Sequence, residues 1–170
     1  FQESAPPFGT SMSPLLAGGL LVMHAGGHEG GALIAFDPGT GREKWVLVGA
    51  GPSYSSPILA TFGGMAQVIA QVHREVVGVD LTSGRRLWSL PFVTPCDQNI
   101  VTPVVAGDLL VLSSLDQGTM AYRLKGSGPP EQVWHTRDVS MYMSTPVHVP
   151  GRLIGLSHRK RGQFFALDVR

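Results

Sequence analysis

Three landmarks recur along this sequence at a spacing of 43 to 46 residues, and this repeat constrains the fold more than any other feature. The first is a serine or threonine followed by a proline that opens an apolar run, and the four prolines lie 43, 46 and 43 residues apart. The second is a short apolar run that ends in a polar residue, at intervals of 43, 43 and 45 residues. The third is a lone tryptophan, at intervals of 43 and 46 residues. Landmarks that keep one period indicate a repeated structural unit. The prolines are Pro14, Pro57, Pro103 and Pro146, and the three tryptophans of the chain are Trp45, Trp88 and Trp134.

Each period divides into four short segments that are typical of β-strands. In the first period, apolar runs at residues 14–16, 20–23, 32–36 and 44–48 alternate with glycine-rich turns. The chain has 22 glycines and 13 prolines among 170 residues, which favours many turns, and no segment keeps a helical periodicity. Four short strands per period are typical of a β-propeller blade, a sheet that buries its faces by stacking around an axis. We therefore expect an all-β fold, a β-propeller of four-stranded antiparallel blades, with residues 1–170 forming one region of about four repeats.

The turn between the third and fourth segments of each period narrows the type of propeller. In the first copy, Ala35 and Asp37 precede a turn that contains Gly41, and Trp45 follows four residues later. An aspartate can accept hydrogen bonds from turn amides, a glycine permits a positive φ, and a small alanine leaves room for an indole ring. We expect each tryptophan to pack against the neighbouring blade as a structural residue. The later copies are Gly78, Asp80, Gly84 and Trp88, then Ala121 and Trp134 with Arg123 in place of the aspartate, then an unfinished copy with Ala166 and Asp168.

This spacing resembles the tryptophan-docking repeat of the pyrroloquinoline-quinone (PQQ) type β-propellers, a family that includes dehydrogenases and outer-membrane assembly factors. The resemblance covers essentially the whole chain and implies a ring of seven or eight blades. A WD-type propeller would place Trp-Asp pairs at strand ends, and the sequence has none. Because the repeat begins and stops part-way through a copy, we expect a piece of a longer ring. The alternative is a ring of four blades in which residues 1–10 supply the outer strand of the last blade.

The loops on the face opposite the aspartate turns are the expected place for a ligand, because binding residues of propellers gather on loops near the axis. Two linkers on this face, residues 97–103 and 140–146, are longer and less regular than the rest of the repeat. Loops that only bridge neighbouring blades would have the same polar composition, so no catalytic residue is assigned. The candidate cofactor-binding residues are Asp97, Gln98, Asn99, Tyr142, His158 and Arg159.

Charged and metal-binding side chains give few further indications of function. His24, His73 and His158 fall on different blades, so we expect no metal site among them. The basic residues 159–161, together with Arg152, suit a solvated turn, an anion or an acidic partner.

The whole-chain properties exclude several classes of protein. A net charge of +1 gives no basic excess for nucleic-acid binding, and no apolar stretch predicts a transmembrane helix or a signal peptide. With Cys96 as its single cysteine, the chain can form no intrachain disulfide.

The resemblance implies two kinds of function. Dehydrogenases of the family hold PQQ against a calcium ion with Glu, Asn and Asp ligands, and many carry a vicinal cysteine pair. This chain has no such pair, and only Asp97 and its single asparagine, Asn99, match the expected ligand types. Other members present their loops to partners. We therefore expect a periplasmic or extracellular binding or scaffold module with no evident cofactor, whose partners are proteins or a small molecule at the loop face. The alternative is part of a PQQ-dependent alcohol or sugar dehydrogenase.

Overall fold

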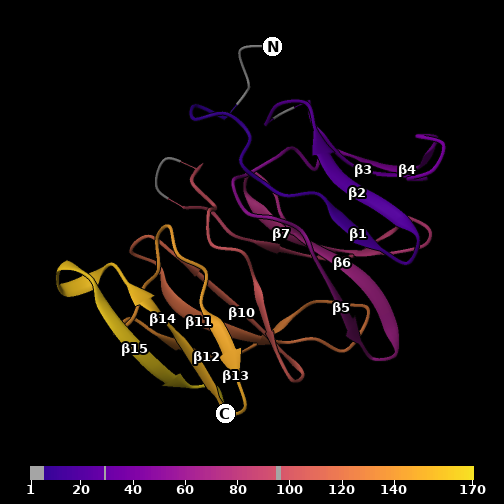
Figure 1. Ribbon diagram of the computed structural model, residues 1–170. Coiled ribbons are helices and arrows are strands. Elements are labelled where there is room, and N and C mark those ends of the chain that lie inside the picture. The colour runs from indigo at the N-terminus through magenta and orange to yellow at the C-terminus, as the bar shows by residue number, and fades with distance from the viewer. Residues whose placement is uncertain (1–5, 29, 95–96) are drawn as a thin grey trace.

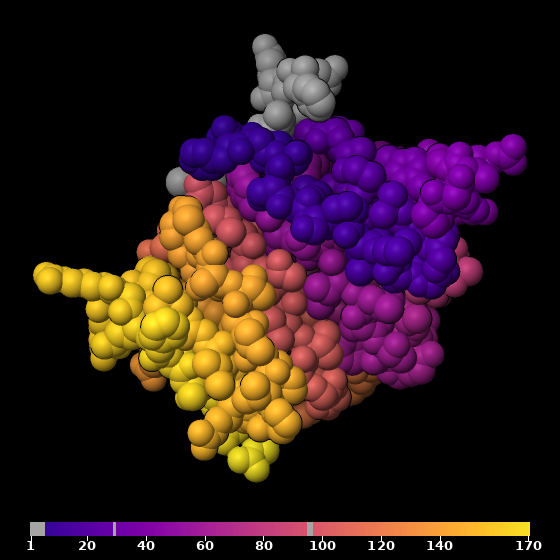
Figure 2. All heavy atoms as spheres, viewed as in Figure 1, coloured from indigo at the N-terminus to yellow at the C-terminus, as the bar shows by residue number. Residues whose placement is uncertain are grey.

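The computed structural model describes residues 6–28, 30–94 and 97–170, and these residues form four antiparallel β-sheets in chain order (Figure 1). Within each sheet, strands that follow each other in the sequence lie side by side, so each sheet is a meander. Figure 2 shows the four sheets as consecutive bands of colour across one face of the molecule. The predicted all-β propeller blades are confirmed. Cys96 and residues 1–5 lie outside the described residues.

Three of the four blades have four strands, and the described part of the last blade has three. Blade 1 contains β1 (Leu15–Ala17), β2 (Leu20–Ala25), β3 (Ala32–Phe36) and β4 (Glu43–Val48). Blade 2 contains β5 (Ile58–Phe62), β6 (Met65–Gln71), β7 (Glu75–Asp80) and β8 (Arg86–Pro91). Blade 3 contains β9 (Val104–Ala106), β10 (Leu109–Ser114), β11 (Gly118–Arg123) and β12 (Glu131–Thr136). Blade 4 contains β13 (Val147–Val149), β14 (Arg152–Ser157) and β15 (Gln163–Asp168), with the short 3-10 helix η2 (Arg159–Arg161) between β14 and β15. Among the described residues, no helix is long and apolar enough to cross a bilayer.

The hydrophobic core consists of three clusters, and each cluster lies between two consecutive blades. Val22 and Leu33 of blade 1 meet Val68 and Val79 of blade 2 in the first cluster. The alternation of side chains along a strand sends neighbouring residues of β6 to opposite faces, so Ile69 contributes to the second cluster instead. Each cluster also contains one tryptophan or packs against one; these are Trp45, Trp88 and Trp134.

Trp45 and Trp134 make the same contact with the blade that follows them. The indole Nε1 of Trp45 donates a hydrogen bond to the carbonyl of Leu81 at 2.9 Å, and that of Trp134 donates to the carbonyl of Val169 at 3.4 Å. Both acceptors directly follow the aspartate of the next repeat. The Trp45 ring also lies against Gly84, where a Cβ would be 2.6 Å from the ring and where φ is +71°. A side chain at that position would therefore displace the ring.

Trp88 differs from the other two tryptophans because a glutamine lies between its indole and the next blade. Its Nε1 donates to Gln67 Oε1 at 2.6 Å, and Gln67 Nε2 donates to the carbonyl of Gly126 in blade 3 at 3.2 Å. The Trp88 ring itself covers Gly78, where a Cβ would overlap the indole. Glycine replaces the alanine of the first copy at this position because the ring lies directly on the backbone.

The aspartate turns have the hydrogen bonds that their sequence predicts. Asp37 Oδ1 accepts from the amides of Gly39 and Thr40, both at 3.0 Å. Asp80 Oδ1 accepts from the amide and the hydroxyl of Ser83 at 2.8 and 2.7 Å. These bonds, chiefly from the Thr40 amide and the Ser83 hydroxyl, hold the pKa of both carboxyls below its usual value.

The repeated Ser/Thr-Pro step joins the first strands of successive blades. The amide of Ser13 donates to Ser56 Oγ at 2.9 Å, the amide of Ser56 donates to Thr102 Oγ1 at 3.2 Å, and the amide of Thr102 donates to Thr145 Oγ1 at 3.2 Å. Ser56 and Thr102 thus each accept a bond from the preceding blade while their own amides donate to the next, whereas in this series Ser13 only donates and Thr145 only accepts. We call these four residues the hydroxyl relay. The proline that follows has no amide hydrogen, so the chain needs no second acceptor there.

Candidate functional site

The linkers that lead into the first strands of the blades line a hollow of about 300 Å³, which we call the axial groove. Four of its residues stand three positions before the repeated proline, one from each blade, and they are Ser11, Tyr54, Ile100 and Met143. Phe8, Gln98 and Tyr142 complete the lining. The repeat therefore brings one equivalent residue from every blade to the same place.

The axial groove combines aromatic and aliphatic side chains with a few polar atoms. Tyr142 donates its hydroxyl to Gln98 Oε1 at 2.7 Å, which joins the two linkers that the sequence singles out. The rings of Phe8 and Tyr54 lie 6.2 Å apart at a tilt of 49°. Phe8 is 76% exposed and Met143 is 70% exposed, so apolar surface is open to solvent here. A largely apolar hollow with a few polar groups suits an apolar or aromatic group of a ligand.

Asn99 has a structural role in the linker between blades 2 and 3. Its side chain is completely buried, and Nδ2 donates to the carbonyls of Val72, His73 and Phe92 at 3.0, 3.2 and 3.1 Å. Its own carbonyl accepts the amide of Tyr54 at 3.0 Å. Asn99 thus holds three segments together.

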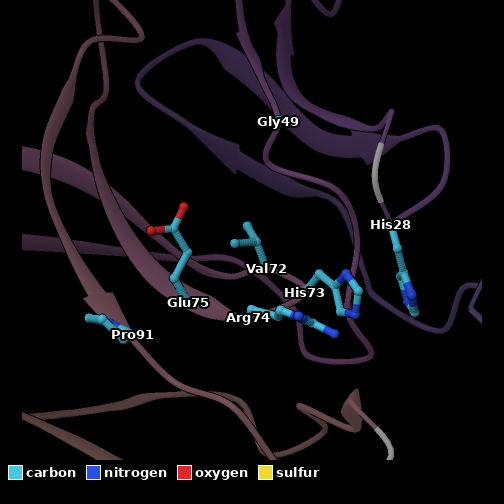
Figure 3. Close-up of a pocket in the computed structure, with 7 residues that line it drawn as sticks. All are labelled: His28, Gly49, Val72, His73, Arg74, Glu75 and Pro91. Atoms are coloured by element: carbon cyan, nitrogen blue, oxygen red, sulfur yellow. The ribbon is translucent and has the colours of Figure 1, made fainter.

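A second hollow, of about 480 Å³, lies between blades 1 and 2, and His73 and Arg74 are among the residues that line it (Figure 3). Asp97 contacts both of these residues. Its Oδ2 is 3.1 Å from His73 Nε2 and 3.6 Å from a terminal nitrogen of Arg74. The polar contact with His73, and then the positive charge of Arg74, hold the pKa of Asp97 below its usual value despite partial burial. In Figure 3 the His73 ring faces the ring of His28, and their centroids are 4.0 Å apart.

His158 and Arg159 lie in a third hollow, of about 460 Å³, between blades 3 and 4. His158 Nδ1 donates to the carbonyl of Ser140 at 2.8 Å, and Nε2 is 3.1 Å from Asp116 Oδ1. The six candidate residues of the sequence therefore occupy separate places. Gln98 and Tyr142 share the axial groove, His158 and Arg159 share the third hollow, and Asn99 serves the packing between blades.

These positions do not fit PQQ held against calcium. The Asn99 amide is enclosed and donates to three carbonyls, and the Asp97 carboxylate is bound by His73 and Arg74. Neither Asp97 nor Asn99 is among the residues that line the three hollows described above. Within the described part of the chain, no group of three or more His, Cys, Asp or Glu side chains is placed to hold a metal ion.

His24 is a buried structural histidine at the interface of blades 1 and 2. It is 6% exposed, and Nδ1 donates to the carbonyl of Ala50 at 3.0 Å. Burial lowers the pKa of His24 from 6.5 to about 4, and the hydrogen bond to Ala50 opposes this only in part. The ring is therefore neutral at pH 7.

The four meandering sheets, the aspartate turns and the indole contacts define the class of this protein, a PQQ-like β-propeller. The chain belongs to the family described as outer membrane protein assembly factor BamB, whose profile matches residues 3–170. No curated protein matches the sequence.

Solved structures of low sequence identity share the fold. BamB from Moraxella catarrhalis is 21% identical with a TM-score of 0.56, over 94% of this chain and 51% of that one. A europium-containing methanol dehydrogenase is 16% identical with a TM-score of 0.52, over 74% of this chain and 24% of that one. The computationally designed Ika4 protein is 14% identical with a TM-score of 0.61, over 100% of this chain and 99% of that one. The chain thus spans about half of that BamB and about a quarter of that dehydrogenase.

Proposed function

We propose that this protein is a non-catalytic, protein-binding propeller of the BamB family that acts outside the cytoplasm. The axial groove is the observation that carries the proposal. It gathers one equivalent linker residue from each blade around Tyr54 and Tyr142, and it leaves Phe8 and Met143 largely exposed. The partner inserts an apolar or aromatic side chain into the axial groove, because removing such a group from water favours binding.

Tyrosine is well suited to such a groove because its ring offers apolar area at a small loss of side-chain freedom. The bond between Tyr142 and Gln98 fixes the orientation of the ring before any partner arrives. Binding then requires little further ordering of the groove, which favours affinity. The family description, which names outer membrane protein assembly, supports a protein partner over a small metabolite.

Site-specific photo-crosslinking tests this proposal. A photoreactive phenylalanine at Met143 of the full-length protein, expressed in its own host, is expected to form one discrete adduct with a partner protein. The same label at Val133, an exposed residue of the outer strand β12, is the matched control and should form none. A second substitution, Tyr142→Ala, should abolish the Met143 adduct, whereas Tyr142→Phe should retain most of it. Equal labelling from both positions, or an adduct insensitive to Tyr142→Ala, would contradict the proposal.

A separate assay addresses the quinoprotein alternative. With PQQ and calcium added to the full-length protein, we expect no saturable quinone binding and no reduction of an artificial electron acceptor by alcohols or sugars. Dye reduction that depends on PQQ would instead support an enzyme and would contradict the non-catalytic assignment.

A further inference from the structure

The hollow between blades 3 and 4 has a composition unlike that of the axial groove. It is lined by Asp116 from the loop between β10 and β11, by Arg137 and Asp138 after β12, and by His158, Arg159 and Lys160 after β14. We call it the basic hollow. Its walls come from two blades, so the relative position of the blades sets its shape.

Three cations of the basic hollow have no carboxylate partner in the described part of the chain. The ion pairs of those residues include none with Arg137, Arg159 or Lys160. In addition, Nε of Arg159 is buried and has no hydrogen-bond acceptor among the described residues. A buried guanidinium N–H without an acceptor is destabilising, so this atom is suited to an acceptor that a ligand supplies.

The acidic residues of the hollow indicate the charge of that ligand. Asp116 Oδ1 lies 3.1 Å from His158 Nε2, and Asp138 adds a second carboxylate to the lining. Two carboxylates close to the binding space repel a doubly charged phosphate more than a singly charged group. The planar fork of a guanidinium matches the two oxygens of a carboxylate.

The corresponding hollow between blades 1 and 2 serves as an internal comparison (Figure 3). It also has a histidine and an arginine in the loop between the second and third strands of the later blade, His73 and Arg74. There, the carboxylate of Asp97 is within 4 Å of both, and Glu75 pairs with Arg86 at 2.7 Å. Arg74 of the comparison hollow is thus paired with a carboxylate, whereas Arg137 and Arg159 of the basic hollow form no ion pair among the described residues.

We propose that the basic hollow binds a carboxylate monoanion, with Arg159 and Arg137 as its hydrogen-bond donors. The carboxylate comes either from an acidic side chain of a protein or from a free carboxylic acid. This site is separate from the axial groove, so the inference stands whether or not the groove binds a partner.

Arginine-selective NMR of the full chain tests this site, because the Nε–Hε signal of Arg159 reports directly on the buried atom. At constant ionic strength, acetate, inorganic phosphate and a capped Ala-Glu-Ala peptide are titrated in turn. We expect a saturable shift of the Arg159 signal with acetate and with the peptide, and weaker binding of phosphate. Tighter binding of the peptide than of acetate would identify a protein source, and equal binding would identify a free acid.

Substitutions distinguish a specific carboxylate site from a general attraction of anions to the positive charge of this region. Arg159→Gln and Arg137→Gln should each weaken carboxylate binding by about tenfold, the effect of losing a charged hydrogen bond. Arg161→Gln, in the same turn but outside the lining, and Arg74→Gln, in the comparison hollow, should leave affinity unchanged. Unshifted melting temperatures would show that the variants fold. Absence of a saturable shift, tighter binding of phosphate, or equal loss in Arg161→Gln would overturn the proposal.

Discussion

At the scale of single residues, Gly78 is the position where the packing leaves least room. A methyl group there would overlap the Trp88 ring, which hydrogen-bonds to Gln67 and is therefore fixed in place. Gly78→Ala should lower the free energy of unfolding by about 1–3 kcal/mol, because an overpacked core must shift its backbone or its rotamers. Denaturant unfolding measures the change. Gly39→Ala is the control, since its added carbon would meet only ordinary contacts and its φ is not positive. Equal stability of the two variants would contradict this account of Trp88.

His24 gives the protein a predictable dependence on pH. Its pKa is about 4 when folded and 6.5 in the reference state, so the unfolded chain binds the proton more readily between these values. The contribution of His24 to the free energy of unfolding is therefore fully present above pH 6.5 and is lost as the pH drops toward 4. This loss amounts to about 3 kcal/mol. Urea unfolding at several pH values measures the slope. In His24→Gln the slope between pH 6.5 and 4 should become markedly shallower, and an unchanged slope would assign the effect to other groups.

At the scale of elements, the hydroxyl relay explains why each blade begins with Ser-Pro or Thr-Pro. Thr102→Val keeps the shape of the side chain but removes the acceptor of the Ser56 amide. We expect a loss of about 1 kcal/mol in the free energy of unfolding, the usual effect of one lost hydrogen bond. Thr61→Val, at an exposed position of β5, is the matched control for the same chemical change. A loss no greater in Thr102→Val than in the control would show that the relay does not contribute.

The sequence predicts these elements well because a blade depends on local features. The period, the glycine turns and the alternation of apolar residues predict the strands of blade 1 to within a few residues, for example 32–36 for β3. The Ser/Thr-Pro step is visible in the sequence, but its hydrogen bonds depend on how neighbouring blades stack. The pairing of Asp97 with His73 depends on a loop in which Asp97 has a φ of +52°, and no sequence pattern specifies that conformation.

The sequence predicts which linkers form the candidate site, but it does not predict which contacts their side chains make. The irregular linkers 97–103 and 140–146 meet in the axial groove through Gln98 and Tyr142. The polar character of Asn99 gave no indication that it binds three carbonyls in the interior. The three basic side chains that have no ion pair among the described residues come together only when the loops of two blades are placed side by side.

At the scale of the whole molecule, stability comes from the interfaces between blades, because a single four-stranded sheet cannot bury both of its faces. Each of the three interfaces described here has its own apolar cluster and its own indole. The three hollows also lie where linkers or loops of different blades meet. The stability of the fold and the shape of these hollows therefore depend on the same stacking.

The most direct test of this stacking is a nuclear Overhauser spectrum that resolves the three indole Nε1–H signals of the chain. We predict contacts from the Trp45 ring to the α-protons of Gly84 and from the Trp88 ring to the α-protons of Gly78, as the close approaches in the structure require. The contact between Trp45 and Gly84 joins blades 1 and 2. A Trp45 ring that contacts only residues of its own blade would contradict the stacked propeller.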